Sequence, residues 1–277
     1  MKIFVPTRGV GDRIISDKQL AGHPQIVTWV ADGDESGFRL RKLFRERGHN
    51  DEQVVVCPTP DLGLGRIGWI RDWVQDNLAD EWYCMIDDNT EIWKLPDPWY
   101  QKPKQTFQGD NWDIDFRKLY RTPATFADIL RLQDELQAEC ERVGTTYAGL
   151  NSQENYFFRY KKWRHTGFLG AKFCIMKQDF PWVYDPAIQV FSDWARTVRT
   201  VHDRGCVVIN AYCHNYSILW QSGGIGTLEQ RKPGIKSCFD YLLSQYGDLI
   251  EYGKETWQLR FKRRVVNTIR KQYEKTT

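Results

Sequence analysis

Two adjacent carboxylates and an amide follow an apolar run in the segment YCMIDDNTEI, Tyr83–Ile92. The run predicts a buried strand, with Asp87, Asp88 and Asn89 at its carboxyl end. Carboxylate and amide oxygens are hard ligands of the kind that Mg²⁺ or Mn²⁺ takes in proteins, with substrate phosphates completing the shell. The pattern therefore indicates a divalent-cation site, with a solvated Asp-Asp-Asn turn after an edge strand as the plain alternative.

A buried arginine is expected in the segment GLGRIGWIRDWV, Gly63–Val74. Apolar residues recur there with helical spacing and define an inward face, and Arg71 falls within this stripe. Because burying a lone guanidinium is costly, Arg71 needs an anionic partner. That partner is either an aspartate of the protein, in an internal salt bridge or positioned for a bound ligand, or the diphosphate of a bound ligand.

A third candidate group is Asp193, in the segment FSDWARTVRTVHDRG, Phe191–Gly205. Ser192 has the residue type of an N-cap, which places Asp193 in the first turn of a helix that Gly205 ends. A carboxylate at the rim of a sheet can take a proton from a substrate. An acid in the first helical turn is also common because it complements the helix dipole, so both interpretations stay open.

Four short apolar runs predict the strands that would position these groups: Lys2–Pro6, Ile26–Ala31, Val54–Cys57 and Trp82–Ile86. Helical patterns between the runs indicate βαβ units, and hence an α/β fold with a mostly parallel central sheet flanked by helices. Ligands of such sheets bind beyond the carboxyl ends of the strands. Thr7, Arg8 and Asp32 stand at two of these ends, beside the aspartates of the fourth.

After a long loop, predicted helices and strands alternate in the rest of the chain as well. The Pro-, Trp- and Asp-rich segment Lys94–Arg121 predicts that loop. A helix is expected next, with Thr122 as its N-cap and Gly144 beyond its end. Apolar runs at Phe173–Met176 and Val207–Tyr212 predict strands on either side of the helix that carries the third candidate group.

The net charge of +3 hides two basic clusters. Lys254–Thr277 carries eight basic residues against two glutamates, and YFFRYKKWRH, Tyr156–His165, has four basic residues and five aromatics. Cations between aromatics are typical of nucleic-acid-binding surfaces, because the cations meet phosphates and the rings stack on bases. A solvated helix face and an aromatic strand with exposed cations are the alternatives. The predicted DNA contacts are Arg159, Lys161, Lys162, Arg164, Arg263 and Arg264.

Composition excludes several classes of protein. With 41% hydrophobic and 27% charged residues, the 277-residue chain can bury a core, so a disordered chain is excluded. No apolar run approaches the roughly 18 residues of a membrane-spanning helix, and the first residues are too short a run for a secretory signal. Seven cysteines without a CxxC pair disfavour a disulfide framework or a structural zinc site. We therefore expect a cytoplasmic protein with no membrane partner.

In their order along the chain, these features resemble a GT-A glycosyltransferase over roughly residues 2–214. The features are the strand–helix alternation, the arginine-bearing helix, the IDDN strand end and the later aspartate at a helix start. More narrowly, GLGRIGWIRDW followed by MIDDN is similar to the TET-associated glycosyltransferases, a phage-rich group linked to DNA hypermodification. If the chain is phage-encoded, the expected location is the host cytoplasm.

The resemblance implies a DxD motif that holds Mn²⁺ or Mg²⁺ against the diphosphate of a nucleotide sugar, with a UDP-sugar as the expected donor. Asn89 stands where the motif usually has aspartate, which removes one charge from the expected metal site. The implied reaction is an inverting single displacement with Asp193 as the catalytic base. The other implied residues are the metal ligands Asp87, Asn89 and His214 and the donor contacts Thr7, Arg8, Asp32, Arg71 and Asp88.

The narrower resemblance implies an acceptor hydroxyl on a 5-hydroxymethylpyrimidine in DNA, with 5-hydroxymethylcytosine favoured. Two other functions stay open: a GT-A enzyme acting on protein or glycan, and a non-catalytic module that binds a nucleotide sugar or DNA. No linker marks a domain boundary, so we expect one GT-A-like domain over residues 1–277. Its expected parts are a donor-binding half (1–95), an acceptor-binding half (96–253) and a basic C-terminal helix (254–277).

Overall fold

A computed structural model of the chain describes residues 1–7, 14–60, 66–94, 122–151, 162–179, 185–188, 190–217, 228–254 and 258–273. At residues 151, 212, 214, 216, 217, 228 and 230 it describes the backbone alone. Arg8, Arg159, Lys161 and almost all of the predicted loop at residues 94–121 lie outside the described residues.

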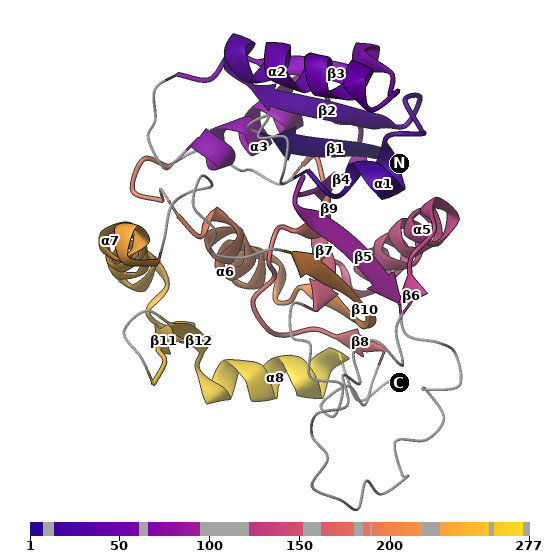
Figure 1. Cartoon of the computed structure of the whole chain (residues 1–277). Coiled ribbons are helices and arrows are strands. Elements are labelled where there is room, and N and C mark those ends of the chain that lie inside the picture. Colours follow the sequence, from indigo (N-terminus) through magenta and orange to yellow (C-terminus); the bar gives the residue numbers. More distant parts are fainter. Residues whose placement is uncertain are drawn as a thin grey trace, which may run out of the picture.

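A ten-stranded sheet forms the centre of the molecule (Figure 1). Four parallel strands make one part of it, in the order β3 (Val54–Cys57), β2 (Val27–Asp32), β1 (Lys2–Thr7) and β4 (Trp82–Ile86). The order continues with β9 (Phe173–Lys177), β7 (Tyr147–Asn151), β10 (Val208–Ser217), β5 (Thr90–Lys94) and β6 (Thr122–Pro123), and β8 (Trp163–Arg164) pairs with β10. Along this described path only β9 and β5 run against the other strands, so the predicted α/β class with a mostly parallel sheet is confirmed.

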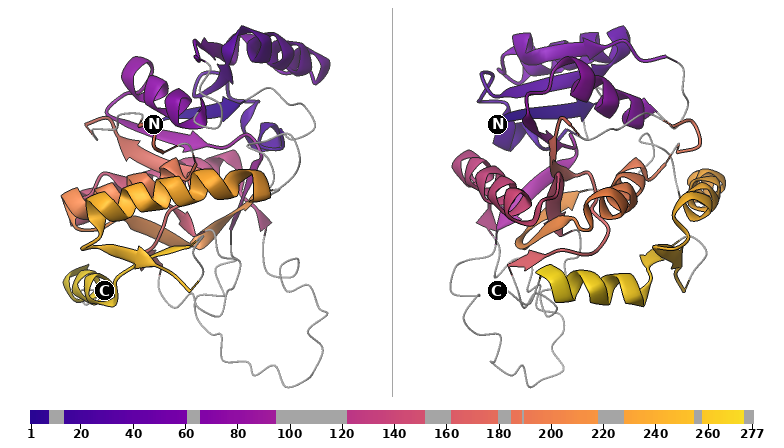
Figure 2. Two further views of the ribbon diagram at one scale, coloured as in Figure 1. Left: turned by 90° about the vertical axis from the view of Figure 1, so that its left-hand side faces the viewer. Right: turned by 180° about the vertical axis from the view of Figure 1, so that it is seen from behind.

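Helices cover both faces of the sheet (Figures 1 and 2). One face carries α1 (Asp17–Leu20), α2 (Gly33–Glu46) and α5 (Phe126–Val143), and the other carries α3 (Arg66–Asn77), α6 (Ser192–Arg204) and α7 (Leu228–Tyr246). A short 3-10 helix, η2 (Asp51–Gln53), precedes β3. Within the described ranges, no helix has the length and apolar character needed to cross a membrane.

Successive side chains along each strand point to opposite faces of the sheet, and this explains why there are two hydrophobic cores. In β1, Ile3 and Val5 pack in the core under α2 and α5, whereas Phe4 between them packs in the core under α3 and α6. The strand β4 divides in the same way, with Cys84 in the first core and Tyr83 in the second. The central strands are buried on both faces, which is why they appear in the sequence as continuous apolar runs.

Helix α5 begins later than the sequence predicts. Thr122 as its N-cap is wrong, because Thr122 lies in β6 and pairs with Lys94 of β5. The N-cap is Thr125, whose Oγ1 accepts a hydrogen bond from the Asp128 N–H, while the Asp128 carboxylate accepts one from the Thr125 N–H. Gly144 ends the helix with a φ of 76°, in the left-handed conformation that a glycine C-cap takes, as expected.

The C-terminal region is a hairpin followed by a helix, so a single helix over residues 254–277 is wrong. The strands β11 (Ile250–Tyr252) and β12 (Leu259–Phe261) pair antiparallel, and α8 (Arg263–Tyr273) begins after them. In the sequence, apolar residues recur every fourth position at Trp257, Phe261, Val265 and Ile269, a spacing that predicts one continuous helix. Phe261 nevertheless belongs to β12, and its ring stacks on that of Phe168 with 4.8 Å between the ring centroids. Strand pairing and this aromatic contact therefore override the helical pattern.

Candidate functional site

The carboxyl ends of β1, β2 and β4 meet at one edge of the sheet. Thr7 is the last residue of β1, Asp32 the last of β2, and Asp87 follows β4 directly. Because these strands are parallel neighbours, their ends lie side by side, as the sequence predicts. The helix α3 begins beside this edge, where Arg66 Nη1 lies 3.5 Å from Asp32 Oδ2.

Arg71 is the central group of the site. Its Nη2 donates to Asp87 Oδ1 at 2.9 Å, and its Nη1 donates to Ser192 Oγ at 3.1 Å. Burial alone lowers the pKa of Arg71, but the carboxylates of Asp87 and Asp193 outweigh it and leave the pKa above its ordinary value. Of the two partners expected for this arginine, the structure contains the internal salt bridge, and its aspartate is the first of the IDDN segment.

Asp193 lies in the first turn of α6, as predicted, and its carboxylate is held by the backbone. Oδ2 accepts a hydrogen bond from the Ala171 N–H at 3.1 Å, and Oδ1 accepts one from the Trp194 N–H at 3.0 Å. Burial raises the pKa of Asp193 above its ordinary value, although Arg71 and the two N–H groups act in the opposite direction. A partly buried carboxylate with a raised pKa, held in place by backbone N–H groups, has the properties of a general base.

The start of α6 differs from the prediction by one residue. The N-cap is Phe191 rather than Ser192, and Phe191 has a φ of 57°, the one positive φ among described residues other than glycine. Ser192 is the first residue of the helix, and its hydroxyl oxygen accepts the hydrogen bond from Arg71. The Phe191 ring packs against Trp194 and Phe239, with centroid distances of 4.7 and 5.5 Å, and these contacts hold the strained backbone in place.

Both the side chain and the main-chain carbonyl of Asp88 accept hydrogen bonds from other parts of the protein. Thr7 Oγ1 donates to Asp88 Oδ2 at 2.6 Å. The main-chain carbonyl of Asp88 accepts hydrogen bonds from the N–H groups of Ile15 and Ser16, at 3.0 and 3.2 Å, and from Ser16 Oγ at 2.9 Å. The turn after β4 is therefore fixed by β1 and by the segment that follows β1.

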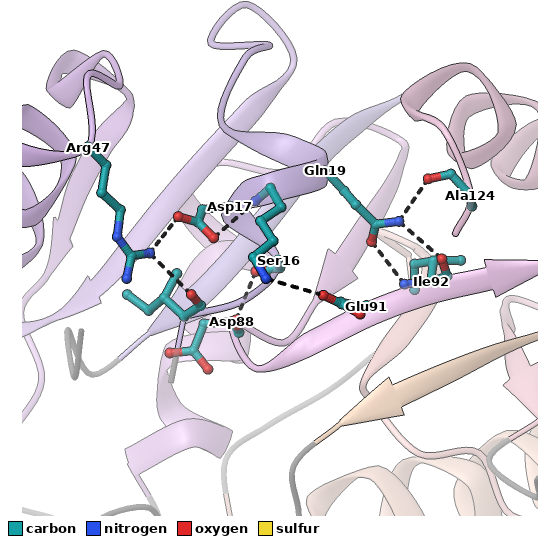
Figure 3. A network of polar contacts seen from close by, with 10 residues as sticks. Ser16, Asp17, Gln19, Arg47, Asp88, Glu91, Ile92 and Ala124 are labelled. Atoms are coloured by element: carbon teal, nitrogen blue, oxygen red, sulfur yellow. Dashed lines mark hydrogen bonds and ion pairs between the residues drawn. The ribbon is translucent and has the colours of Figure 1, made fainter. Parts of the chain in front are cut away.

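Figure 3 shows how this segment is braced. The Asp17 carboxylate pairs with Arg47, and Gln19 Nε2 donates to the carbonyls of Ile92 and Ala124 at 3.0 and 2.7 Å (Figure 3). Sequence reasoning missed Ser16 and Gln19, because nothing local distinguishes them from surface residues of a short helix. Their role depends on contacts with residues more than 70 positions away.

Asp32 forms a second polar corner with groups that the sequence did not single out. Its side chain is buried beside Arg66, at the start of α3. Burial raises the pKa of the neighbouring Cys57 thiol, hydrogen bonds from Thr59 and Trp69 oppose the rise, and the Asp32 charge adds to it. This corner thus offers a carboxylate, a cation and an indole at the end of β2 and β3.

The side chains at this edge fit a hard cation that the protein holds through few ligands, rather than one that the protein encloses. Asp87 uses Oδ1 for Arg71 and keeps its side chain 27% exposed, so the carboxylate is still accessible to a ligand. His214 lies in β10 opposite Trp93 of β5, and its side chain is not described. Among the described side chains, no group of three or more His, Cys, Asp or Glu could hold a metal ion. Mg²⁺ commonly binds through one or two carboxylates plus substrate phosphates, which agrees with this arrangement.

The predicted DNA contacts on α8 are exposed, whereas Lys162 forms an ion pair. Arg263 and Arg264 are exposed, although Arg264 Nη2 also donates to the Asp248 carbonyl at 3.0 Å. The outer face of α8 also carries Arg270 and Lys271, and the helix contains no acidic residue. Lys162 lies 2.9 Å from Glu135. The cluster's last residue, His165, is buried with its Nε2 2.8 Å from Glu139 Oε1. The ring centroids of His165, which follows β8, and Tyr273 of α8 lie 5.8 Å apart.

Comparison with known proteins gives only remote likenesses. No family profile matches the chain, and no curated protein sequence matches it. Among solved structures, A197 from STIV is 11% identical with a TM-score of 0.34, and the alignment covers 79% of this chain and 86% of that one. Two structures of glucosyl-3-phosphoglycerate synthase from Mycobacterium tuberculosis, one with Mg²⁺ and UDP and one with Mn²⁺, UDP-glucose and phosphoglyceric acid, are 9% and 10% identical. Both have a TM-score of 0.44 and cover 94% of this chain and 86% of theirs. At such low identities and TM-scores, these likenesses establish neither a family nor an activity.

Proposed function

We propose that the chain is a metal-dependent glycosyltransferase with a nucleotide-sugar donor, a UDP-sugar being expected. The proposed acceptor is the hydroxyl of a 5-hydroxymethylpyrimidine in DNA, with 5-hydroxymethylcytosine favoured. The observation that carries this proposal is the convergence of two carboxylates, Asp87 and Asp193, on Arg71 at the carboxyl edge of the parallel strands. The Asp87 side chain is 27% exposed, whereas the pKa of Asp193 is raised by desolvation, so the two carboxylates are suited to different tasks.

The donor would lie across the ends of β1, β2 and β4. Asp87, with Asn89 and His214, is the proposed cation ligand, and Thr7, Arg8, Asp32 and Asp88 are proposed to shape the nucleotide site. When bound, Mg²⁺ or Mn²⁺ would neutralise the charge that develops on the diphosphate leaving group. In support, the Thr7–Asp88 bond and the Asp32–Arg66 pair fix polar groups at this edge before any ligand arrives.

Asp193 is the proposed catalytic base. As the acceptor hydroxyl attacks the anomeric carbon, its O–H bond breaks and the proton passes to the Asp193 carboxylate. A new carbon–oxygen bond forms, and the bond from the anomeric carbon to the diphosphate oxygen breaks with its electron pair on the diphosphate. The Ala171 and Trp194 N–H groups hold the carboxylate in one orientation, as such proton transfer requires. A single displacement of this kind inverts the configuration at the anomeric carbon.

The basic outer face of α8 supports DNA as the acceptor. Arg263, Arg264, Arg270 and Lys271 are exposed along a helix without acidic residues, and such a face suits a row of phosphates. A base inside a duplex hides its hydroxymethyl group in the groove, so the enzyme would grip the backbone and flip the base, at a cost of a few kcal/mol. An enzyme acting on protein or glycan would have the same donor site but no use for this face.

The test is a transfer assay with the purified chain, Mn²⁺ and a panel of nucleotide sugars. The acceptors are duplex DNA containing 5-hydroxymethylcytosine, unmodified DNA, and a protein and glycan panel, with products detected by mass spectrometry. We expect a sugar-mass adduct on the modified duplex alone and none with Asp87→Asn. Transfer only to protein or glycan would reject the DNA acceptor and keep the enzyme class. Binding of a nucleotide sugar with neither transfer nor slow hydrolysis would identify a non-catalytic module.

A further inference from the structure

The guanidinium of Arg71 joins two parts of the molecule that are far apart in the sequence. Its Nη2 binds Asp87, 16 positions away at the end of β4, and its Nη1 binds Ser192, 121 positions away at the start of α6. The side chain is 8% exposed, each terminal nitrogen has one partner inside the protein, and the Nε atom is buried. An arginine placed in this way is poorly situated to touch a diphosphate itself.

We propose that Arg71 is a positioning residue that holds Asp87 toward a bound cation and sets the spacing between Asp87 and Asp193. It would act through these two carboxylates and not as a direct donor contact. The inference rests on the proposed function, in which Asp87 meets the cation and Asp193 takes the proton.

The shape of the guanidinium supports this role. Its planar fork presents N–H groups in fixed directions, so one side chain can bind a carboxylate and a hydroxyl at a defined angle. Binding Oδ1 of Asp87 restrains rotation of the carboxylate and leaves Oδ2 for another ligand. Carboxylates that bind metals are commonly hydrogen-bonded in this way by a neighbouring residue. A lysine at position 71 would keep the charge but could not reproduce the two directed bonds.

A second connection between the two carboxylates runs through the loop before β9. The Asp87 N–H donates to the Lys172 carbonyl at 3.0 Å, and the adjacent Ala171 N–H donates to Asp193 Oδ2 at 3.1 Å. Arg71 therefore closes a ring of contacts, and a ring restrains the spacing of its members more tightly than one chain of contacts would. Groups that act on one substrate must be held to within about half an ångström, which such a ring can provide. The ring consists of Asp87, Arg71, Ser192, Asp193, Ala171 and Lys172.

The chain offers a matched control in Arg196. This arginine of α6 is also buried, at 3% exposure, and its Nη2 lies 3.5 Å from Asp72 Oδ1 on α3. It thus connects the same two helices as Arg71 does, but through Asp72, which lies within α3 and not at a strand end. A loss of helix packing would affect Arg71→Lys and Arg196→Lys alike, whereas a loss of positioning would affect only the first.

The experiment measures Mn²⁺ binding in the presence of UDP by electron paramagnetic resonance, and thermal unfolding, for the wild type, Arg71→Lys, Ser192→Ala and Arg196→Lys. We expect Arg71→Lys to weaken Mn²⁺ binding by about 10- to 100-fold, the usual effect of losing a partner of a metal ligand. Ser192→Ala removes only a hydroxyl, so it should fold, and it should weaken Mn²⁺ binding by several-fold although Ser192 is no metal ligand. Because both changes break the same bridge, the double variant should bind Mn²⁺ no more weakly than Arg71→Lys alone. Arg196→Lys should lower the unfolding temperature and leave Mn²⁺ affinity unchanged.

Unchanged Mn²⁺ affinity in folded Arg71→Lys and in Ser192→Ala would overturn the positioning role while leaving the proposed function intact. An equal loss in Arg196→Lys would also overturn it, because general packing would then explain the effect. A wild-type protein that binds no Mn²⁺ with UDP would instead overturn the proposed metal site and this inference together.

Discussion

Thr7 Oγ1 donates a 2.6 Å hydrogen bond to Asp88 Oδ2, and this bond joins residues 81 positions apart. Thr7 ends β1 and Asp88 follows β4, which is the parallel neighbour of β1. In the turn after β4, Asp88 is bound to Thr7, while its neighbour Asp87 is bound to Arg71. The two adjacent aspartates therefore have different partners, one joining the turn to β1 and the other joining it to α3.

We predict that Thr7→Val, which keeps the shape of the side chain and removes the donor, destabilises the fold. A hydrogen bond to a charged group contributes about 1.5–3 kcal/mol, and the free energy of unfolding should fall by roughly that amount in urea denaturation. Mn²⁺ binding with UDP should weaken as well, because the turn that carries Asp87 loses a restraint. The control is Thr268→Val on α8, where Oγ1 donates only to the Arg264 carbonyl of its own helix. Equal losses in the two variants would show that the Thr7 bond has no special role.

Asp193→Asn should separate catalysis from donor binding. Asparagine keeps the size of the side chain but cannot take a proton, so transfer should fall by roughly 10²- to 10⁴-fold. Donor affinity, measured by calorimetry with Mn²⁺ and UDP, should stay within about twofold of wild type, because the Asp193 carboxylate is bound by backbone N–H groups of its own surroundings. A parallel loss of donor affinity would assign Asp193 a structural or metal-binding role, and an unchanged rate would remove it from the reaction.

The acidic limb of the pH profile should report the same residue. Burial raises the pKa of Asp193, so its protonated form persists to a higher pH than that of an ordinary carboxyl group. Since only the ionised form can take the proton, kcat/KM should decline as the pH falls through this raised pKa. The measurement is kcat/KM for transfer across the acidic range. A limb at or below the ordinary pKa of an aspartate, about 3.9, would contradict the assignment.

The sequence is informative where the structure depends on local pattern. The strands β3 and β4 begin and end where their apolar runs do, because β4 is buried throughout, β3 is buried at both of its ends, and polar residues precede each strand. The place of Asp87 at a strand end follows from those bounds. Likewise, Gly205 ends α6 with a φ of 82°, which a residue with a side chain adopts at a cost.

Contacts between distant residues could not be predicted from local patterns. The Arg71–Ser192 bond spans 121 positions, and Ser192 looks like an N-cap in the sequence although the structure gives that place to Phe191. In the same way, Thr122 and Thr125 are equally good caps by residue type. The pairing of β6 with β5 and the capping box with Asp128 decide between the two threonines.

Asp128 should stabilise the fold in a pH-dependent way. Burial raises the pKa of its carboxyl group, but hydrogen bonds from Lys94 and Thr125 outweigh it and hold the pKa at about 2. The group is thus ionised more readily in the folded state than in the unfolded state, and its contribution is present above about pH 4 and lost as the pH falls through about 2. We expect Asp128→Asn to lower the free energy of unfolding by roughly 2 kcal/mol at neutral pH and by little near pH 2. The control is Asp134→Asn on the exposed face of the same helix, and equal effects at both pH values would contradict the prediction.

The last prediction concerns the acceptor. Arg263 and Lys271 are exposed on α8, and a double charge reversal, Arg263→Glu with Lys271→Glu, changes this face without removing a buried group. The control is Arg39→Glu with Lys42→Glu on the exposed side of α2, which makes the same change in net charge where no DNA contact is proposed.

If α8 binds DNA phosphates, its variant should bind every duplex more weakly, because phosphates carry no sequence information. Each lost phosphate contact should reduce the salt slope of log affinity by about 0.9, measured between about 50 and 200 mM salt. Donor affinity should stay unchanged, because Asp87 follows β4 and Asp193 lies at the start of α6, and neither is on α8. The α2 variant should keep the DNA affinity and the salt slope of the wild type, because no DNA contact is proposed on α2. An effect of net charge alone would instead change the two variants equally. A shift of the same size in the two variants would therefore reject α8 as the DNA-binding face, and only a loss specific to α8 ties the acceptor to this helix.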